Sequence, residues 1–179
     1  MNTAMLILRL VVGGLFVGHG LQKLFGWFDG PGIEGMAGML NSLGYRPGRN
    51  HAVLAGLTEA GGGALLVLGL FTPLAAAAVI GMMLNATLSV HRPNGLWVQD
   101  NGYEYPLVLG TAAFAIALAG GGVYTVDNAI GLHTGAGWGV VSLLFGLAVG
   151  AAIYSSRSTP AEAASEAATE DQDEERRAA

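Results

Sequence analysis

Ionisable side chains inside long apolar stretches are the residues of this sequence whose types and positions could support chemistry. Arg9, His19 and Lys23 interrupt the first apolar stretch, and Glu59 lies near the middle of the second. The seven-residue repeat of Arg9, Phe16 and Lys23, with His19 near the same face, places the basic groups on one stripe of a helix. A carboxyl group in hydrocarbon must stay protonated or gain a cationic partner. We therefore expect an Arg9–Glu59 or His19–Glu59 pair.

Depth in the membrane selects further polar residues. A helix rises about 1.5 Å per residue, which places Glu59 at a level between Arg9 and His19. Asn85 and the polar residues at the adjoining ends of the third and fourth stretches fall in one half of the bundle. The predicted ligand or proton cavity comprises Arg9, His19, Gln22, Lys23, Glu59, Asn85, His91 and Glu104.

Three kinds of site fit these residues. Ionisable groups inside a membrane indicate function by default, and a proton relay or a quinone-type pocket is one such function. The structural alternative is that ion pairs lock the helices together while His91 and Glu104 lie among lipid headgroups. A metal site formed by His19, Glu59 and His91 is disfavoured, because no two of these ligands are three or four residues apart. No metal is predicted, and no residue is assigned a catalytic role.

Five apolar stretches must position these groups. They span about residues 4–25, 51–70, 73–92, 104–121 and 137–155, and each approaches the roughly 20 residues that cross a bilayer core. A soluble helical bundle would need a polar face on each helix, which stretches two and three lack. Only 12% of the residues are charged, whereas an ordinary soluble domain has about 25%. The sequence therefore predicts an all-α polytopic membrane helix bundle in contact with the lipid bilayer.

Two segments outside the spans have their own character. Residues 33–43 carry apolar side chains at helical spacing, which predicts a short amphipathic helix in the membrane interface. This helix could be a lid over a site or a simple connector. Residues 156–179 are rich in Ala, Glu and Ser without a large apolar residue, which predicts a disordered acidic tail.

Charge and glycine placement predict orientation and packing. Most Lys and Arg residues lie in or beside the loops 26–50 and 93–103 and the tail, so we expect the tail in the cytoplasm and the N-terminus outside a plasma membrane. Two GxxxG pairs, Gly14/Gly18 and Gly146/Gly150, allow close helix contact. We expect this contact within the chain rather than at a dimer face.

Several functional classes are excluded or disfavoured. The chain has no cysteine, which excludes disulfides, thiolate metal ligands, cysteine-ligated iron–sulfur clusters and thiol catalysis. No basic stripe is present, so nucleic acid is not an expected partner. No motif binds flavin, haem or an iron–sulfur cluster, so no intrinsic cofactor is predicted.

Several segments also resemble the DoxX family of membrane proteins. They are LRLVVGGLFVGHGLQKLFG at 8–26, TEAGGGALLVLGLFTPLAA at 58–76, SVH at 89–91 and NGYEYPLVLG at 101–110, while YTVDNAIG at 124–131 is similar to the usual end of that domain. The resemblance follows the family order over about residues 6–130. It implies a four-helix DoxX-like domain over residues 1–135, to which 136–155 adds a fifth transmembrane helix. The family-like positions are Arg9, His19, Lys23, Glu59 and Glu104.

The resemblance also implies a functional class. The family includes the quinone-linked subunit of archaeal thiosulfate oxidation, and many members are labelled oxidoreductases. It implies a quinone as ligand, with His19 or Lys23 bonding a carbonyl oxygen, Glu59 exchanging protons, and electrons supplied by a partner protein.

Two other functional classes stay open. One is a non-enzymatic scaffold, accessory or lipid-binding subunit, within a larger membrane complex or a homo-oligomer. The other is a small-solute or proton transporter, which is disfavoured because no inverted repeat and no clearly broken helix is visible. Whether the chain is an enzyme is left undecided by the sequence.

The buried carboxyl group yields a first prediction. Glu59→Ala should lower the stability by several kcal/mol because it leaves a cation unpaired in the membrane, whereas replacing both partners should cost little. Thermal unfolding in detergent measures the difference. An unchanged melting temperature for the single variant would show that Glu59 is not part of a buried pair.

Overall fold

The computed structural model describes residues 2–158, and all regular secondary structure in that range is helical. Disorder was predicted for the tail, residues 156–179, and 159–179 lie outside the described residues. The α-helices are α1 Asn2–Phe25, α2 Gly32–Ser42, α3 Gly48–Leu68, α4 Thr72–Ala86, α5 Glu104–Ala119, α6 Val126–Ala129 and α7 Ala136–Ser155. A π-helical turn, η1 Thr87–His91, continues α4, followed by the 3-10 turns η2 Arg92–Asn94 and η3 Val98–Asp100.

Four of these helices are long and apolar enough to cross a membrane: α1, α3, α4 with its continuation to Asn94, and α7. Helix α5 is shorter, with 16 residues or roughly 24 Å. It nevertheless runs antiparallel along α1, because Tyr105 at its start contacts His19 and Gly121 just beyond its end contacts Arg9. The predicted polytopic all-α membrane bundle is confirmed, and the chain is an integral membrane protein.

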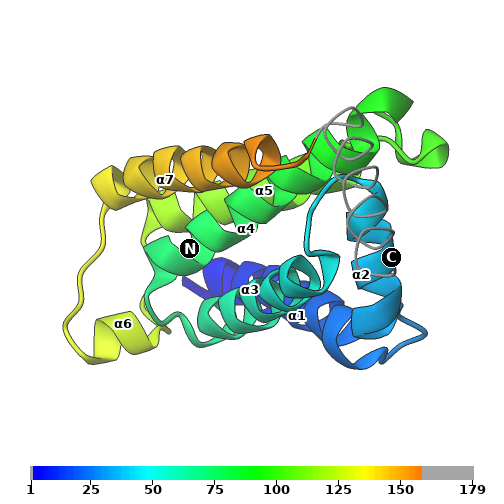
Figure 1. Ribbon diagram of the computed structural model, residues 1–179. Helices are drawn as coiled ribbons and strands as arrows, with labels where there is room; N and C mark the ends of the chain where they lie inside the picture. The colour runs from blue at the N-terminus through cyan, green and yellow to red at the C-terminus, as the bar shows by residue number, and fades with distance from the viewer. Residues whose placement is uncertain (1, 159–179) are drawn as a thin grey trace, which may run out of the picture.

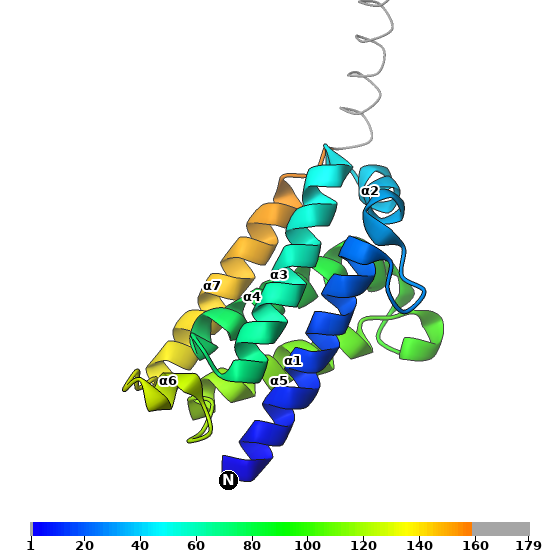
Figure 2. The same ribbon diagram turned by 90° about the horizontal axis from the view of Figure 1, so that it is seen from below.

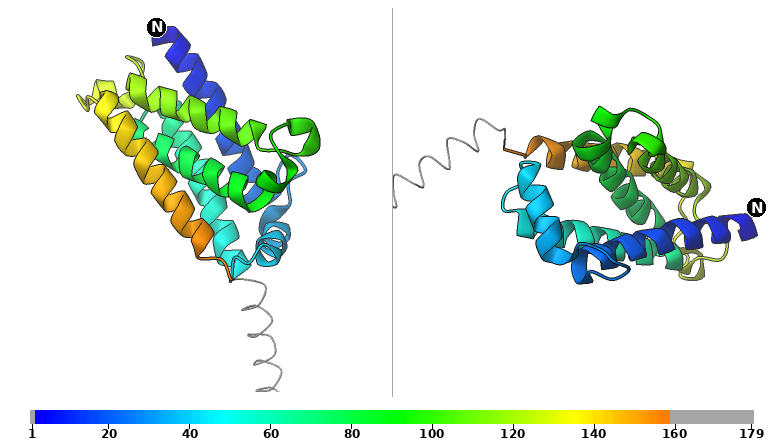
Figure 3. Two further views of the ribbon diagram at one scale, coloured as in Figure 1. Left: turned by 90° about the horizontal axis from the view of Figure 1, so that it is seen from above. Right: turned by 90° about the vertical axis from the view of Figure 1, so that its right-hand side faces the viewer.

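The helices form two layers. Helices α1 and α3 pack along each other in one layer, and α4, α5 and α7 form the other (Figure 1). Helix α2 lies across one end of the bundle, in the segment expected to form an amphipathic helix, while the N-terminus lies at the opposite end (Figure 2). The last turn of α7 also reaches the α2 end (Figure 3). The Lys- and Arg-rich segments are therefore gathered at one end, which we call the α2 end.

Glycines let the helix backbones approach closely within each layer. A Cβ atom on Gly13 would lie 2.7 Å from the Gly63 carbonyl oxygen, and one on Gly146 would lie 2.6 Å from the Ala77 carbonyl oxygen. Packing within the chain is therefore confirmed for Gly146/Gly150. It is wrong for Gly14/Gly18, because a Cβ atom on either residue would meet nothing within 4 Å.

A tight hairpin joins α3 to α4 at the end opposite to α2. Gly69 ends α3 in the left-handed conformation with φ +64°, and Pro73 lies in the first turn of α4. The turn bonds some of the end groups itself, since the Gly69 N–H donates to the Leu66 carbonyl oxygen at 3.1 Å. The Val67 carbonyl oxygen and the first N–H groups of α4 need other partners.

Arg9 and Asp127 supply the missing hydrogen bonds. Arg9 is 1% exposed, and its guanidinium donates to the carbonyl oxygens of Leu66 at 3.1 Å and Val67 at 3.0 Å, in the last turn of α3. A third bond, of 2.8 Å, reaches the Gly121 carbonyl oxygen beyond α5. A cation at a helix C-terminus is also favoured by the helix dipole.

The Asp127 carboxylate performs the complementary task on α4. It is 1% exposed and accepts hydrogen bonds from the backbone N–H groups of Phe71 at 2.7 Å and Thr72 at 2.8 Å. The predicted Arg9–Glu59 pair is therefore wrong. Arg9 lies at the end of the bundle opposite to α2, where it bonds carbonyl oxygens in the last turn of α3.

Removing the Asp127 carboxylate should destabilise the whole bundle. Asp127→Ala leaves the buried Thr72 N–H and the part-buried Phe71 N–H unpaired. A buried N–H without a partner costs about 1–3 kcal/mol, so the free energy of unfolding should fall by about 2 kcal/mol. Asp100→Ala is the matched control, since Asp100 is an exposed acid on a 3-10 turn. Equal melting temperatures of the two variants in detergent would contradict this role.

Candidate functional site

Lys23 and Glu59 form an ion pair between α1 and α3. Lys23 Nζ lies 2.5 Å from Glu59 Oε2, and the two side chains are 19% and 5% exposed. The close contacts of Gly13 with Gly63 and of Gly20 with Gly56 set the register of the two helices and place Glu59 level with about residue 17 of α1. The Lys23 side chain therefore extends towards the middle of the membrane, whereas a lysine near a helix end commonly reaches outwards to the interface.

A second polar pair, between α1 and α5, adjoins this ion pair. His19 Nε2 lies 3.1 Å from the Tyr105 hydroxyl, and His19 Nδ1 lies 3.1 Å from Gln22 Oε1. Glu59 is close enough to Tyr105 to interact with it electrostatically. Tyr105 is 39% exposed, so the cluster opens outwards between α1 and α5. We call His19, Gln22, Lys23, Glu59 and Tyr105 the α1/α3/α5 cluster.

The other predicted cavity residues lie elsewhere. Asn85 accepts a hydrogen bond from the Tyr45 hydroxyl, His91 Nδ1 lies 2.8 Å from the Asn101 carbonyl oxygen, and Glu104 accepts from a backbone N–H of its own loop. The prediction of one cavity lined by all eight residues is therefore wrong. Counting along a helix gives the height of a residue in the membrane but not the direction in which its side chain points.

The pairing of Glu59 was also mispredicted. Its partner is Lys23 rather than Arg9 or His19. The backbones of Lys23 and Glu59 lie at different heights in the membrane, but the long lysine side chain spans that difference. Among the described residues, no three His, Cys, Asp or Glu side chains come close enough to hold a metal ion.

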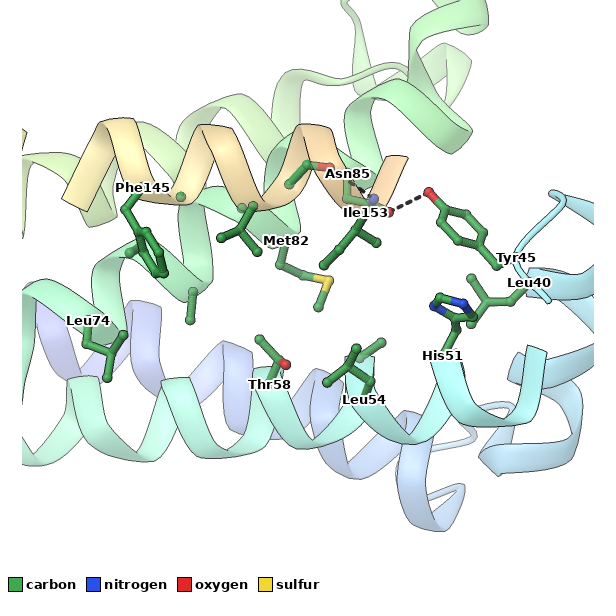
Figure 4. A pocket seen from close by; sticks show the side chains of 17 residues that line it. Leu40, Tyr45, His51, Leu54, Thr58, Leu74, Met82, Asn85, Phe145 and Ile153 are labelled. Atoms are coloured by element: carbon green, nitrogen blue, oxygen red, sulfur yellow. Dashed lines mark hydrogen bonds between the residues drawn. The ribbon is translucent and has the colours of Figure 1, made fainter. Parts of the chain in front are cut away.

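A groove of about 350 Å³ lies on another face of α3, between α3 and the pair α4/α7 (Figure 4). Most of its lining is apolar, from residues such as Leu54, Met82 and Phe145. Its polar side chains gather mainly at the α2 end, where His51 and Tyr45 are found. The groove and the α1/α3/α5 cluster are thus separate sites. The adjacent residues Thr58 and Glu59 lie in the groove and in the cluster, respectively.

The polar end of the groove is held in place by a hydrogen-bonded group. The Tyr45 hydroxyl is 2.9 Å from Asn85 Oδ1 and 2.5 Å from Ser89 Oγ, and Tyr45 is 2% exposed. Ser89 belongs to the π-helical turn η1, a distortion that is frequent at functional sites. Helix α2 contributes Leu40 to the groove, so α2 and the connection after it close this end.

Residues 4–92 match the family model named DoxX, which includes the Lys23–Glu59 pair and the π-helical turn up to its end. The chain belongs to the DoxX family. Neither the curated proteins nor the solved structures contain a match. The matched region of this DoxX protein ends before α5, so Tyr105 and all of α7 lie outside it.

Sequence reasoning left out Tyr45, His51, Tyr105 and Asp127 as site or structural residues. Tyr105 directly follows Glu104, a predicted cavity residue, so its position in the sequence could have indicated it. Tyr45 and His51 flank a Pro- and Gly-containing loop, and Asp127 lies in a connecting segment. No periodicity extends through such loops, so nothing in the sequence indicated which helix end each side chain would meet.

A double-mutant cycle tests the observed pairing. The free energies of unfolding of Lys23→Met, Glu59→Gln and the double variant should reveal a coupling of about 1–3 kcal/mol, as for neighbours in one ion pair. The same cycle with Arg9→Met should be additive within about 0.5 kcal/mol, because these groups lie far apart. Coupling in the second cycle but not in the first would overturn the assignment.

Proposed function

We propose that this DoxX protein is the quinone-interacting subunit of a membrane oxidoreductase system. The observation that carries the proposal is the α1/α3/α5 cluster, where a membrane-embedded acid–base pair adjoins a His–Tyr pair that the bilayer can reach. A quinone carries two carbonyl oxygens that accept hydrogen bonds, and it takes up two protons and two electrons when it becomes a quinol. The cluster contains groups that can bond the carbonyl oxygens and groups that can supply the protons.

Specific donors are free for a quinone oxygen. The Lys23 ammonium has three N–H donors, and Glu59 is its hydrogen-bond partner among the described residues. His19 contacts Gln22 and Tyr105 through its two ring nitrogens, so it can bond a quinone oxygen by exchanging one of these partners. His19 and Tyr105 are partly accessible from outside the bundle. In the proposed complex, His19 or Lys23 donates to a carbonyl oxygen, and Glu59 passes protons to the reduced ring.

Electrons come from a partner in this proposal. The chain contains no cysteine and no recognisable motif for a redox cofactor. An electron-donating protein at the membrane surface would therefore reduce the quinone while the DoxX protein binds the ring and exchanges protons. The α2 end is the side on which such a partner would meet the cluster, because Lys23 and Tyr105 lie near the helix ends there.

We also place the α2 end in the cytoplasm and the N-terminus outside the plasma membrane. Loops rich in Lys and Arg stay preferentially on the cytoplasmic side. The basic residues of the described range at or near the α2 end are Lys23, Arg46, Arg49, Arg92 and Arg157, whereas Arg9 near the other end is buried.

A second candidate is a non-enzymatic accessory subunit. Lys23 with Glu59, and His19 with Tyr105, already form mutual contacts that would suffice to lock three helices. The Gly14/Gly18 face of α1 has no close neighbour among residues 2–158 and could meet another membrane helix. Co-purification with a defined complex that assembles normally with Glu59→Gln would favour this function.

Quinone binding in lipid nanodiscs tests the first proposal. A short-chain quinone analogue should bind the wild-type protein. His19→Ala removes a donor and Tyr105→Phe removes the hydroxyl that holds the His19 ring, so each should weaken binding about fivefold, on the scale of one hydrogen bond. Glu34→Gln is the control, because Glu34 forms an exposed ion pair with Arg49 on the surface. Absence of binding, or equal affinities for all variants, would refute the proposal.

A further inference from the structure

We propose that the groove between α3, α4 and α7 is a binding site for one anionic phospholipid, with an acyl chain along the groove and the phosphate at the α2 end. This inference is independent of the proposed quinone function, because the α1/α3/α5 cluster lies on a different face of α3. It concerns a ligand taken from the surrounding bilayer.

The shape of the groove fits a lipid chain that enters sideways. Helices α3 and α7 both pack on α4 but not closely on each other, so the groove lies in the gap between them (Figure 4). Leu54 and Phe145 line it and are 51% and 54% exposed, so they face the bilayer at its mouth. From Leu74 to Asn85, both in the lining, α4 extends roughly 16 Å along its axis.

The wall of the groove is smooth where a chain would lie. Helix α4 contributes Ala77, Ala78 and Gly81, and α7 contributes Gly146 and Gly150, all of which are small. These residues also bring α4 and α7 into backbone contact, which makes the wall continuous. A groove of about 350 Å³ can therefore hold an extended chain, but it offers little that distinguishes one chain from another.

Selectivity must come from the polar end. A lipid tail gains little by leaving other tails for an apolar groove, because the bilayer is as apolar as the protein surface. His51 projects into the groove at the α2 end, and its ring nitrogens have no hydrogen-bond partner among residues 2–158 (Figure 4). A polar group in apolar surroundings is stabilised by a ligand that bonds it.

Arg157 adds a positive charge beside the same end. Its guanidinium carbon is 3.7 Å from the centre of the Tyr154 ring and 5.7 Å from that of Tyr45, which lines the groove. Only Nε is used, in a bond to the Tyr154 carbonyl oxygen, and no carboxylate in the described part of the chain pairs with Arg157. The remaining N–H groups suit a phosphate oxygen.

The charge decides between a phospholipid and a neutral occupant. The Tyr45 hydroxyl is already bonded to Asn85 and Ser89. Within residues 2–158, Arg157 and His51 are groove-end residues with N–H donors that have no acceptor. Because no carboxylate of residues 2–158 pairs with the Arg157 guanidinium, an anion complements its charge, whereas a neutral carbonyl group does not. The α2 end also carries other basic residues, which attract anionic headgroups to this level.

Lipid retention measured by native mass spectrometry tests the site. The full-length protein, released from vesicles of equal phosphatidylglycerol and phosphatidylcholine, should retain one phosphatidylglycerol molecule at least about tenfold more often, as expected for hydrogen bonds to a charged group. Arg157→Gln should abolish most of this preference, and Thr58→Phe should reduce retention of both lipids by filling the groove. Arg92→Gln, which removes an exposed cation from the same end, is the control and should behave as the wild-type protein.

Distinct results would overturn the inference. Equal retention of the two lipids by the wild-type protein, or an unchanged preference in Arg157→Gln, would show that no anionic site exists. If Thr58→Phe abolished binding of the quinone analogue and Tyr105→Phe did not, the groove would be the quinone site. Quinone binding that is absent in every variant while phosphatidylglycerol is still retained would refute the proposed function and leave the lipid site intact.

Discussion

The hairpin between α3 and α4 imposes the constraint on which the rest of the bundle depends. Gly69 and Thr72 at its two helix ends are buried, so the open backbone groups there must find partners inside the protein. Arg9 bonds the carbonyl groups of α3, and Asp127 bonds the N–H groups of α4. Because Arg9 belongs to α1 and also reaches Gly121 beyond α5, four helices are fixed at one height by a few hydrogen bonds.

Fixing the helix heights at one end aligns the polar groups nearer the other end. Glycines between α1 and α3 remove the side chains that would separate the two backbones, and Glu59 then lies within reach of Lys23. The ion pair is the second tie between these helices. Buried pairs of this kind contribute specificity of register more than net stability, which makes their position more informative than their strength.

Helix α3 divides the bundle into two chemically different sides. One face carries Glu59 into a cluster of ionisable groups, and the adjoining face carries His51 into an apolar groove. The second side depends on α7, which lies outside the matched DoxX region and supplies one wall of the groove. Helix α7 therefore helps to determine what α3 and α4 present to the bilayer.

The sequence by itself determined the membrane character, the helices and the residue types of the site, because apolar length and periodicity are local properties. It predicted a short helix at 33–43, which is observed at 32–42, and it selected Lys23, His19 and Glu59 together. Only the tertiary structure decided that Lys23 pairs with Glu59, that Arg9 belongs to the opposite end, and that Asn85 faces Tyr45. These choices depend on helix rotation, on side-chain reach and on backbone groups left open at a distant turn, none of which follows from positions along the chain.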